Sequence, residues 1–231
     1  MSMYWEEDPQ DGDFTVPKDV IDLVFTIQCK HLPNEHAWAL GQALLAELPW
    51  LRDEAGAGVH PIQISETGNG WMRPEHPDEL LHLSRRTRLV LRIPDHRREE
   101  AEALLGKTLD VAGHPMTLLK AANRDLSTST TLFSRHIVVE TGDNEGDFID
   151  RIASRLQGMG IRPRKMLPGK ARRLRIPGGE LQTCSLMLAK LSVAESVTLQ
   201  QRGLGEHRHL GCGLFVAHKD IDEVSPEQVM R

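Results

Sequence analysis

The chain has 231 residues, of which 39% are hydrophobic and 26% charged, and its net charge is −5 at pH 7. This composition is typical of a soluble globular protein, and the length allows one large domain or two small ones. No apolar run is long enough to span a membrane, the acidic first residues exclude a signal peptide, and the three cysteines (Cys29, Cys184 and Cys212) form no CxxC pair. We therefore expect a soluble protein of a reducing compartment, the cytoplasm.

The first half of the chain predicts a complete set of alternating strands and helices. Residues 1–19 form an acidic lead-in. Hydrophobic patterning in 20–125 then predicts a strand, a helix capped by Asn34, two strands, a second helix and a final strand or hairpin; these elements fall at 20–28, 34–48, 59–65, 87–94, 95–106 and 107–121. The order β-α-β-β-α-β is that of a ferredoxin-like domain.

The same order begins again after a Ser/Thr-rich joint at 126–131. A strand, a helix, two strands joined at a Pro-Gly-Gly turn, a helix and a short last strand are predicted at 132–140, 145–160, 171–189, 192–203 and 214–217. The sequence therefore predicts an α+β fold of two tandem ferredoxin-like domains, 20–125 and 132–231, with a glycine-rich loop near the C-terminus.

Positive charge is concentrated in one segment, although the whole chain is acidic. Residues 151–179 hold nine lysines and arginines and no acidic residue. A polyanion responds to such a local field within a Debye length, so the segment favours a nucleic-acid partner. The alternative is an ordinary solvated surface of a helix and a hairpin.

Several stretches resemble nucleotide-binding or metal-binding motifs but lack residues that those motifs require. The stretch LLGKTL (104–109) lacks the first glycine of a phosphate-binding loop, and the glycines of 203–213 do not have G-x-G-x-x-G spacing. His207 and His209 have no acidic or cysteine partner at metal-site spacing, so no metal and no cofactor are expected.

Five segments together resemble the RAMP superfamily of CRISPR systems, and within it the endoribonucleases of the myxobacterial subtype that process precursor CRISPR RNA. They are DLVFTIQCKHLPNEHAWALGQAL (22–44), GVHPIQISETGNG (58–70), SRRTRLVLRIP (84–94), GKTLDVAGHPMTL (106–118) and GLGEHRHLGCGLFVAHKDI (203–221). The resemblance implies metal-independent cleavage within the CRISPR repeat, in which a ribose 2′-hydroxyl attacks and leaves a cyclic phosphate. It also implies CRISPR repeat RNA as the partner, in stem-loop form, together with other subunits of an effector complex.

Two histidines are the candidate catalytic residues. His36 lies at the start of the first predicted helix, where the helix dipole disfavours the charged ring and leaves it able to accept a proton. Relatives often carry a catalytic histidine in this region, so the resemblance favours His36 as the base. His60 is the second candidate, as general acid; each histidine could instead be a structural polar residue.

The candidate RNA-binding residues fall in two groups. The basic stretch would contact phosphates, and the glycine-rich loop would lie between the two domains with its backbone N–H groups and one arginine along the RNA. The residues are Arg162, Arg164, Lys165, Lys170, Arg172, Arg173 and Arg175 in the first group, and Gly203, Gly205, His207, Arg208, Gly211 and Gly213 in the second. The alternatives are a RAMP subunit that binds CRISPR RNA without cutting it, a general RNA-binding protein, and a loop that only closes the fold.

Overall fold

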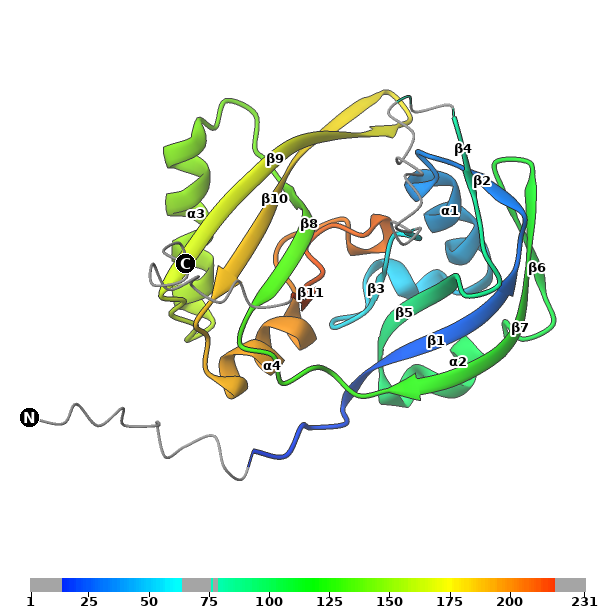
Figure 1. The fold of residues 1–231 in the computed structure, drawn as a ribbon, viewed down its shortest axis with the longest axis horizontal. Coiled ribbons are helices and arrows are strands. Elements are labelled where there is room, and N and C mark those ends of the chain that lie inside the picture. Colours follow the sequence, from blue (N-terminus) through cyan, green and yellow to red (C-terminus); the bar gives the residue numbers. More distant parts are fainter. Residues whose placement is uncertain (1–13, 64–75, 77–78, 219–231) are drawn as a thin grey trace, which may run out of the picture.

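A computed structural model describes residues 14–63, 76 and 79–218 (Figure 1). Most of the acidic lead-in, the end of the strand predicted at 59–65, and residues 219–231 lie outside this part of the chain.

The first half forms a five-stranded antiparallel sheet in the order β3-β5-β1-β7-β6. Its strands are β1 (Val20–Gln28), β3 (Gly58–Val59), β5 (Arg88–Pro94), β6 (Thr108–Val111) and β7 (His114–Arg124). Its helical elements are α1 (Ala37–Glu47), η1 (Pro49–Arg52), η2 (Asp95–Arg97) and α2 (Arg98–Glu102). A separate pair of short strands, β2 (His31–Pro33) and β4 (Leu80–His82), flanks this sheet.

The second half forms a four-stranded antiparallel sheet in the order β11-β8-β10-β9. Its strands are β8 (Leu132–Val138), β9 (Lys165–Ile176), β10 (Gly179–Ala189) and β11 (Val216–Ala217), and its helical elements are α3 (Glu145–Gly158), α4 (Val193–Arg202) and η3 (Arg208–Leu210). With β6 set aside, both halves place their four strands in the same spatial order, fourth-first-third-second. This shared order confirms the α+β fold of two ferredoxin-like units.

Each half has its own apolar core. Alternate residues of β1, such as Leu23 and Phe25, are fully buried under α1, and the apolar face of α3 packs Phe148 and Ile152 against the second sheet. Figure 1 shows α3 on the side of the second sheet that faces away from the first half, and the loop that contains η3 between the two halves. Within the described part of the chain, no helix is both long enough and apolar enough to cross a bilayer.

The structure corrects three boundaries in the first half. Asn34 does not cap the first helix: the N-cap residue is His36, while the Asn34 N–H donates to Glu79 O and its side chain to His76 O. The helix predicted at 95–106 is only η2 followed by the single-turn α2. Within the described residues, the strand predicted at 59–65 is replaced by the two-residue β3, Gly58–Val59, which pairs with β5. In the second half, capping boxes at Asn144 and Ser192 begin α3 and α4 close to the predicted positions.

Candidate active site and nucleic-acid interface

His36 lies at the amino end of α1, as the sequence predicted. Its carbonyl accepts the first helical hydrogen bond, from Leu40 N–H at 2.8 Å, and its ring Nδ1 lies 2.9 Å from Pro33 O. Because a carbonyl oxygen can only accept, Nδ1 carries a proton, and Nε2 holds the lone pair in the neutral ring. The whole residue is 2% exposed. His36 therefore has the tautomer of a base, at a buried position.

Glu35, which sequence reasoning missed, connects this helix end to the second half. Its Oε1 accepts the backbone N–H of Arg175 at 2.6 Å, and its Oε2 lies 3.2 Å from Arg175 Nε. Arg175 lies one residue before the end of β9, beside the turn that leads to β10. The contact therefore brings His36 and Arg175, a predicted RNA-binding residue, into the same region. The sequence signal for it is the carboxylate of Glu35, which directly precedes the predicted catalytic residue.

His60 lies in a different environment, directly after β3. Its Nε2 is 3.4 Å from Asp22 Oδ1, and its backbone N–H donates to Val90 O. Burial lowers the pKa of His60 against the opposing effect of the Asp22 carboxylate, so the ring is neutral. A general acid must carry a proton to donate, so this environment favours a structural role for His60.

Asp22 and Arg92 form a buried charge network that the sequence analysis did not identify. Arg92 Nε donates to Asp22 Oδ1 at 2.9 Å, and its Nη1 donates to two carbonyls of the second half, Gln200 O at 3.1 Å and Phe215 O at 2.8 Å. Burial alone would raise the pKa of Asp22, but hydrogen bonds from His60 and Arg92 and the positive charge of Arg92 hold it far below its usual range. The sequence signal for such a pair is a single acidic residue, Asp22, in one apolar strand and a basic residue, Arg92, in another.

The glycine-rich loop, residues 203–213, uses most of its N–H groups internally. Gly203 N–H donates to Leu199 O, Gly211 N–H to Arg208 O, and Gly213 N–H to His136 O. These three amides are therefore engaged by the protein, and their contact with RNA phosphates stays a prediction. Among the described residues, Gly205 N–H makes no backbone hydrogen bond, and this glycine is exposed at a φ of 83°.

Arg208 holds the loop against the first half. Its guanidinium donates to the carbonyls of Arg202, Gln201 and Gly56, the last at 3.0 Å. Burial lowers its pKa to about 10, so the group remains charged at neutral pH. These backbone contacts favour a role in closing the fold, and a phosphate contact by Arg208 stays a prediction.

Two glycines of the first half allow the loop to approach it closely. A Cβ on Gly41 would lie 2.8 Å from His209 O, and a Cβ on Gly58 would lie 2.7 Å from a Leu214 methyl group. The loop therefore forms part of the contact between the halves.

The exposed part of the loop borders an open cavity of about 860 Å³ between the two halves. Gly205 and His207, both predicted to bind RNA, line it together with Arg52, Arg202 and acidic residues such as Glu54. Of the loop residues proposed from sequence, these two are the best placed for an external ligand.

The basic stretch runs along β9, the edge strand of the second sheet. Alternation along the strand places Arg173 and Arg175 on one face, while Arg172 shares the other face with the buried Leu174. Arg162 precedes the strand and donates its backbone N–H to Glu195. The basic side chains therefore do not form a single one-sided patch.

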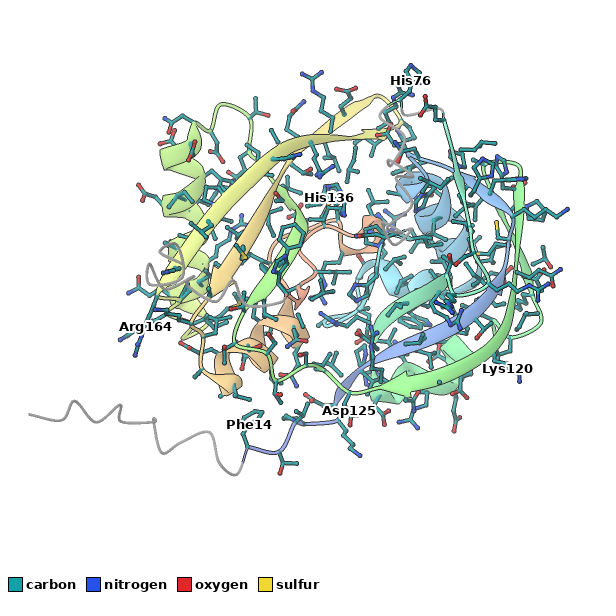
Figure 2. All side chains as sticks on the ribbon, in the orientation of Figure 1. Phe14, His76, Lys120, Asp125, His136 and Arg164 are labelled. Atoms are coloured by element: carbon teal, nitrogen blue, oxygen red, sulfur yellow. The ribbon has the colours of Figure 1, made fainter. Side chains whose placement is uncertain are left out.

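These charges extend over the whole length of the hairpin. Figure 2 shows Arg164 projecting from the molecule at the end of the hairpin away from the β9–β10 turn, while Arg175 lies near that turn. Lys165 and Lys170 are exposed between them.

His136 lies between the two sheets and was not predicted as a site residue (Figure 2). The side chain is buried, and its Nδ1 lies 3.0 Å from Thr183 Oγ1. Across the residues that the structure describes, no three or more His, Cys, Asp or Glu side chains are grouped so that they could hold a metal ion.

Comparison with known proteins identifies the family. The Cas6 CRISPR family model matches residues 21–220. The chain is 30% identical over 197 residues to the CRISPR-associated endonuclease Cas6 of Myxococcus xanthus strain DK1622, covering 85% of this chain and 80% of the relative. A solved Cas6-related protein from Pyrococcus furiosus has a TM-score of 0.61 at 14% identity, covering 87% of this chain and 99% of its own. A solved RAMP protein described as binding different RNA substrates has the same TM-score at 15% identity, covering 86% of this chain and 100% of its own. The chain belongs to the Cas6 family.

Proposed function

We propose that this chain is an endoribonuclease that cleaves precursor CRISPR RNA within the repeat. The observation that carries the proposal is a histidine at a helix N-terminus whose Nδ1 lies 2.9 Å from Pro33 O, an arrangement that leaves Nε2 to accept a proton, in a member of the Cas6 family. The relative from Myxococcus xanthus is itself named an endonuclease.

In the proposed reaction His36 Nε2 takes the proton of the ribose 2′-hydroxyl. The 2′-oxygen attacks the adjacent phosphorus, the bond from phosphorus to the 5′-oxygen breaks, and a protonated group supplies the proton of the new 5′-hydroxyl. The other product end is a 2′,3′-cyclic phosphate. Because the nucleophile belongs to the substrate, the reaction needs a base, an acid and cations near the phosphate, and we propose that it proceeds without a metal.

The hairpin of β9 and β10 is the proposed RNA grip. Its exposed Lys165, Lys170 and Arg173 offer charge to phosphates along the strand, and Gly205 and His207 add a second contact at the cavity. Phosphate contacts of this kind position a duplex or stem by shape. We accordingly assign residues 20–125 the catalytic helix and 132–231 the RNA-binding hairpin and loop.

One observation favours a second candidate, a RAMP subunit that binds CRISPR RNA without cutting it. His36 is 2% exposed, whereas a catalytic base must contact the substrate. Under the first proposal, RNA binding has to make Nε2 accessible; under the second, His36 only caps α1.

Cleavage of the cognate repeat RNA in EDTA separates the two candidates. The variants are His36→Asn and His36→Ala, and the substrates are the repeat and a copy with a 2′-deoxyribose at the scissile position. Asparagine can still donate to Pro33 O, so His36→Asn removes the base while keeping the local hydrogen bond. His96→Ala, at a histidine with a 65% exposed side chain in the same half, is the matched control.

We expect the wild type and His96→Ala to cut, the deoxy substrate to survive, and His36→Asn to bind normally while cutting about 10²- to 10⁴-fold more slowly. Binding without cutting by the wild type would establish the non-catalytic candidate. Normal cutting by His36→Asn would remove His36 as the base and make His60→Asn the next variant. The cytoplasmic location and the effector-complex partners implied by the family stay predictions.

A further inference from the structure

Glu35 contacts Arg175 through both oxygens of its carboxylate. One oxygen accepts the Arg175 backbone N–H at 2.6 Å and the other lies 3.2 Å from Nε of the same residue. The two partners belong to different halves of the protein and are separated by 140 residues in sequence. A carboxylate with two bonds to one residue fixes both the position of that residue's backbone and the direction of its side chain.

The backbone bond follows from the place of β9 in its sheet. Within the part of the chain that the structure describes, β9 is an edge strand, so the N–H groups on its outer side face no neighbouring strand there. Arg175 is the Cα partner of Glu180 on β10, yet its N–H points to Glu35. The amino end of α1 therefore supplies the acceptor that a fifth strand would otherwise provide.

The exposures of the two side chains differ. The Glu35 side chain is 16% exposed and the Arg175 side chain 52% exposed. The carboxylate is thus largely withdrawn from water, whereas half of the arginine side chain remains accessible to a phosphate. Glu35 also directly precedes His36 in the chain, so whatever holds Glu35 also restrains the proposed base.

We propose that Glu35 is a positioning residue that couples RNA binding on the hairpin to catalysis at α1. In this role, which rests on the proposed function, Arg175 holds a repeat phosphate with its exposed side while Glu35 fixes Arg175 relative to His36. The scissile 2′-hydroxyl is thereby placed at a fixed distance from Nε2. We call the contact between Glu35 and Arg175 the clamp. Loss of the clamp leaves the RNA bound but misplaced.

The test compares Glu35→Ala and Glu35→Gln with a matched control, Glu180→Gln. Glu180 is on the same hairpin, and its Oε2 lies 3.5 Å from Arg173 Nη1 in a pair of exposed side chains. The readouts are the affinity for repeat RNA and the single-turnover cleavage rate at saturating enzyme. We expect Glu35→Ala to lower the saturated rate about 10- to 100-fold while the dissociation constant changes less than about threefold. Glu35→Gln, whose amide oxygen can still accept the Arg175 N–H, recovers part of the rate, and Glu180→Gln behaves as the wild type.

The clamp also predicts non-additivity: Glu35→Ala combined with Arg175→Ala is no slower than the slower single variant. An unchanged saturated rate in Glu35→Ala, or a loss confined to affinity, would overturn the proposal.

Hydrogen exchange of the Arg175 amide gives a readout that does not depend on activity. It should rise in Glu35→Ala and not in Glu180→Gln, and no rise would refute the clamp. A wild type that does not cut would instead refute the proposed function.

Discussion

Arg92 is 1% exposed and makes four hydrogen bonds, two to Asp22 and two to carbonyl oxygens of the second half. Taking a charge out of water is costly unless its partners are complete, and here they come from both halves. The arginine therefore stabilises the contact between the halves only while all its acceptors are in place.

Replacing Arg92 by methionine should lower the free energy of unfolding by about 3–5 kcal/mol, because the buried Asp22 carboxylate loses its main partner. Arg124→Met is the matched control. Arg124 also reaches Asp22, at 3.0 Å, but its side chain is 57% exposed, so its loss should cost at most about 1 kcal/mol. Urea denaturation of both variants measures the difference, and equal losses would contradict it.

As the pH falls, the protein should lose stability through His60 at a higher pH than through its carboxylates. The pKa of His60 is lowered in the folded state, so below about pH 6.5 the unfolded chain binds a proton that the folded chain does not. Stability from this group is complete above that pH and falls by up to about 1.4 kcal/mol per pH unit below it. The lowered pKa of Asp22 adds a further loss near pH 4 and below.

The measurement is the free energy of unfolding at pH 5 to 8 for the wild type and His60→Asn. We expect the slope below pH 6.5 to be shallower in the variant, whatever its absolute stability. Parallel curves would show that His60 titrates alike in both states.

At the scale of elements, long and strongly patterned segments were predictable and short ones were not. A Pro-Gly-Gly turn marks where β9 joins β10, and a capping box marks where α3 begins. The start of β9 has no such signal, and the strand begins at Lys165, six residues before the predicted 171. β3 instead ends at Val59, because its length is set by pairing with β5 and not by its own apolar pattern. The environment of His60 depends on Asp22, 38 positions earlier in the sequence, which no local pattern reveals.

The glycine-rich loop gives a prediction at this scale. A Cβ at Gly213 would overlap the Leu204 carbonyl, and its φ of 68° is unfavourable for other residues. Gly213→Ala should therefore destabilise by more than the about 1–2 kcal/mol of backbone strain alone. Gly178→Ala is the control, because Gly178 has a φ of 86° and nothing within 4 Å of the added carbon. Thermal unfolding compares the two, and equal shifts would mean that the overlap is relieved.

The hairpin predicts how RNA affinity responds to salt. Lys170→Ala should weaken binding about equally across repeat sequences and reduce the slope of log K against log salt by about 1, because one phosphate contact is lost. Lys120→Ala is the matched control; Figure 2 shows Lys120 on the first half, far from the hairpin. Binding titrations from 50 to 300 mM salt test this, and an unchanged slope in Lys170→Ala would place the RNA elsewhere.

At the scale of the whole molecule, the two halves are joined by the buried Arg92 and by further polar contacts nearer the surface. Besides Arg92, Arg208 donates to Gly56 O, Gln201 to Asp19, and Arg135 to Gln63. We expect a single unfolding transition in calorimetry, with equal calorimetric and van't Hoff enthalpies. Two resolved transitions would mean that each half is stable alone.

The contact between Arg92 and Phe215 also has a consequence for synthesis. Phe215 is added 123 residues after Arg92, which takes a ribosome about 6–25 s at about 5–20 residues per second. The other carbonyl acceptor, Gln200, is added 108 residues after Arg92. For most of that interval the nascent first half therefore contains an arginine with neither carbonyl acceptor, and the surface that the loop later covers is open to water. We therefore expect the nascent first half to expose an aggregation-prone surface until the final strand arrives.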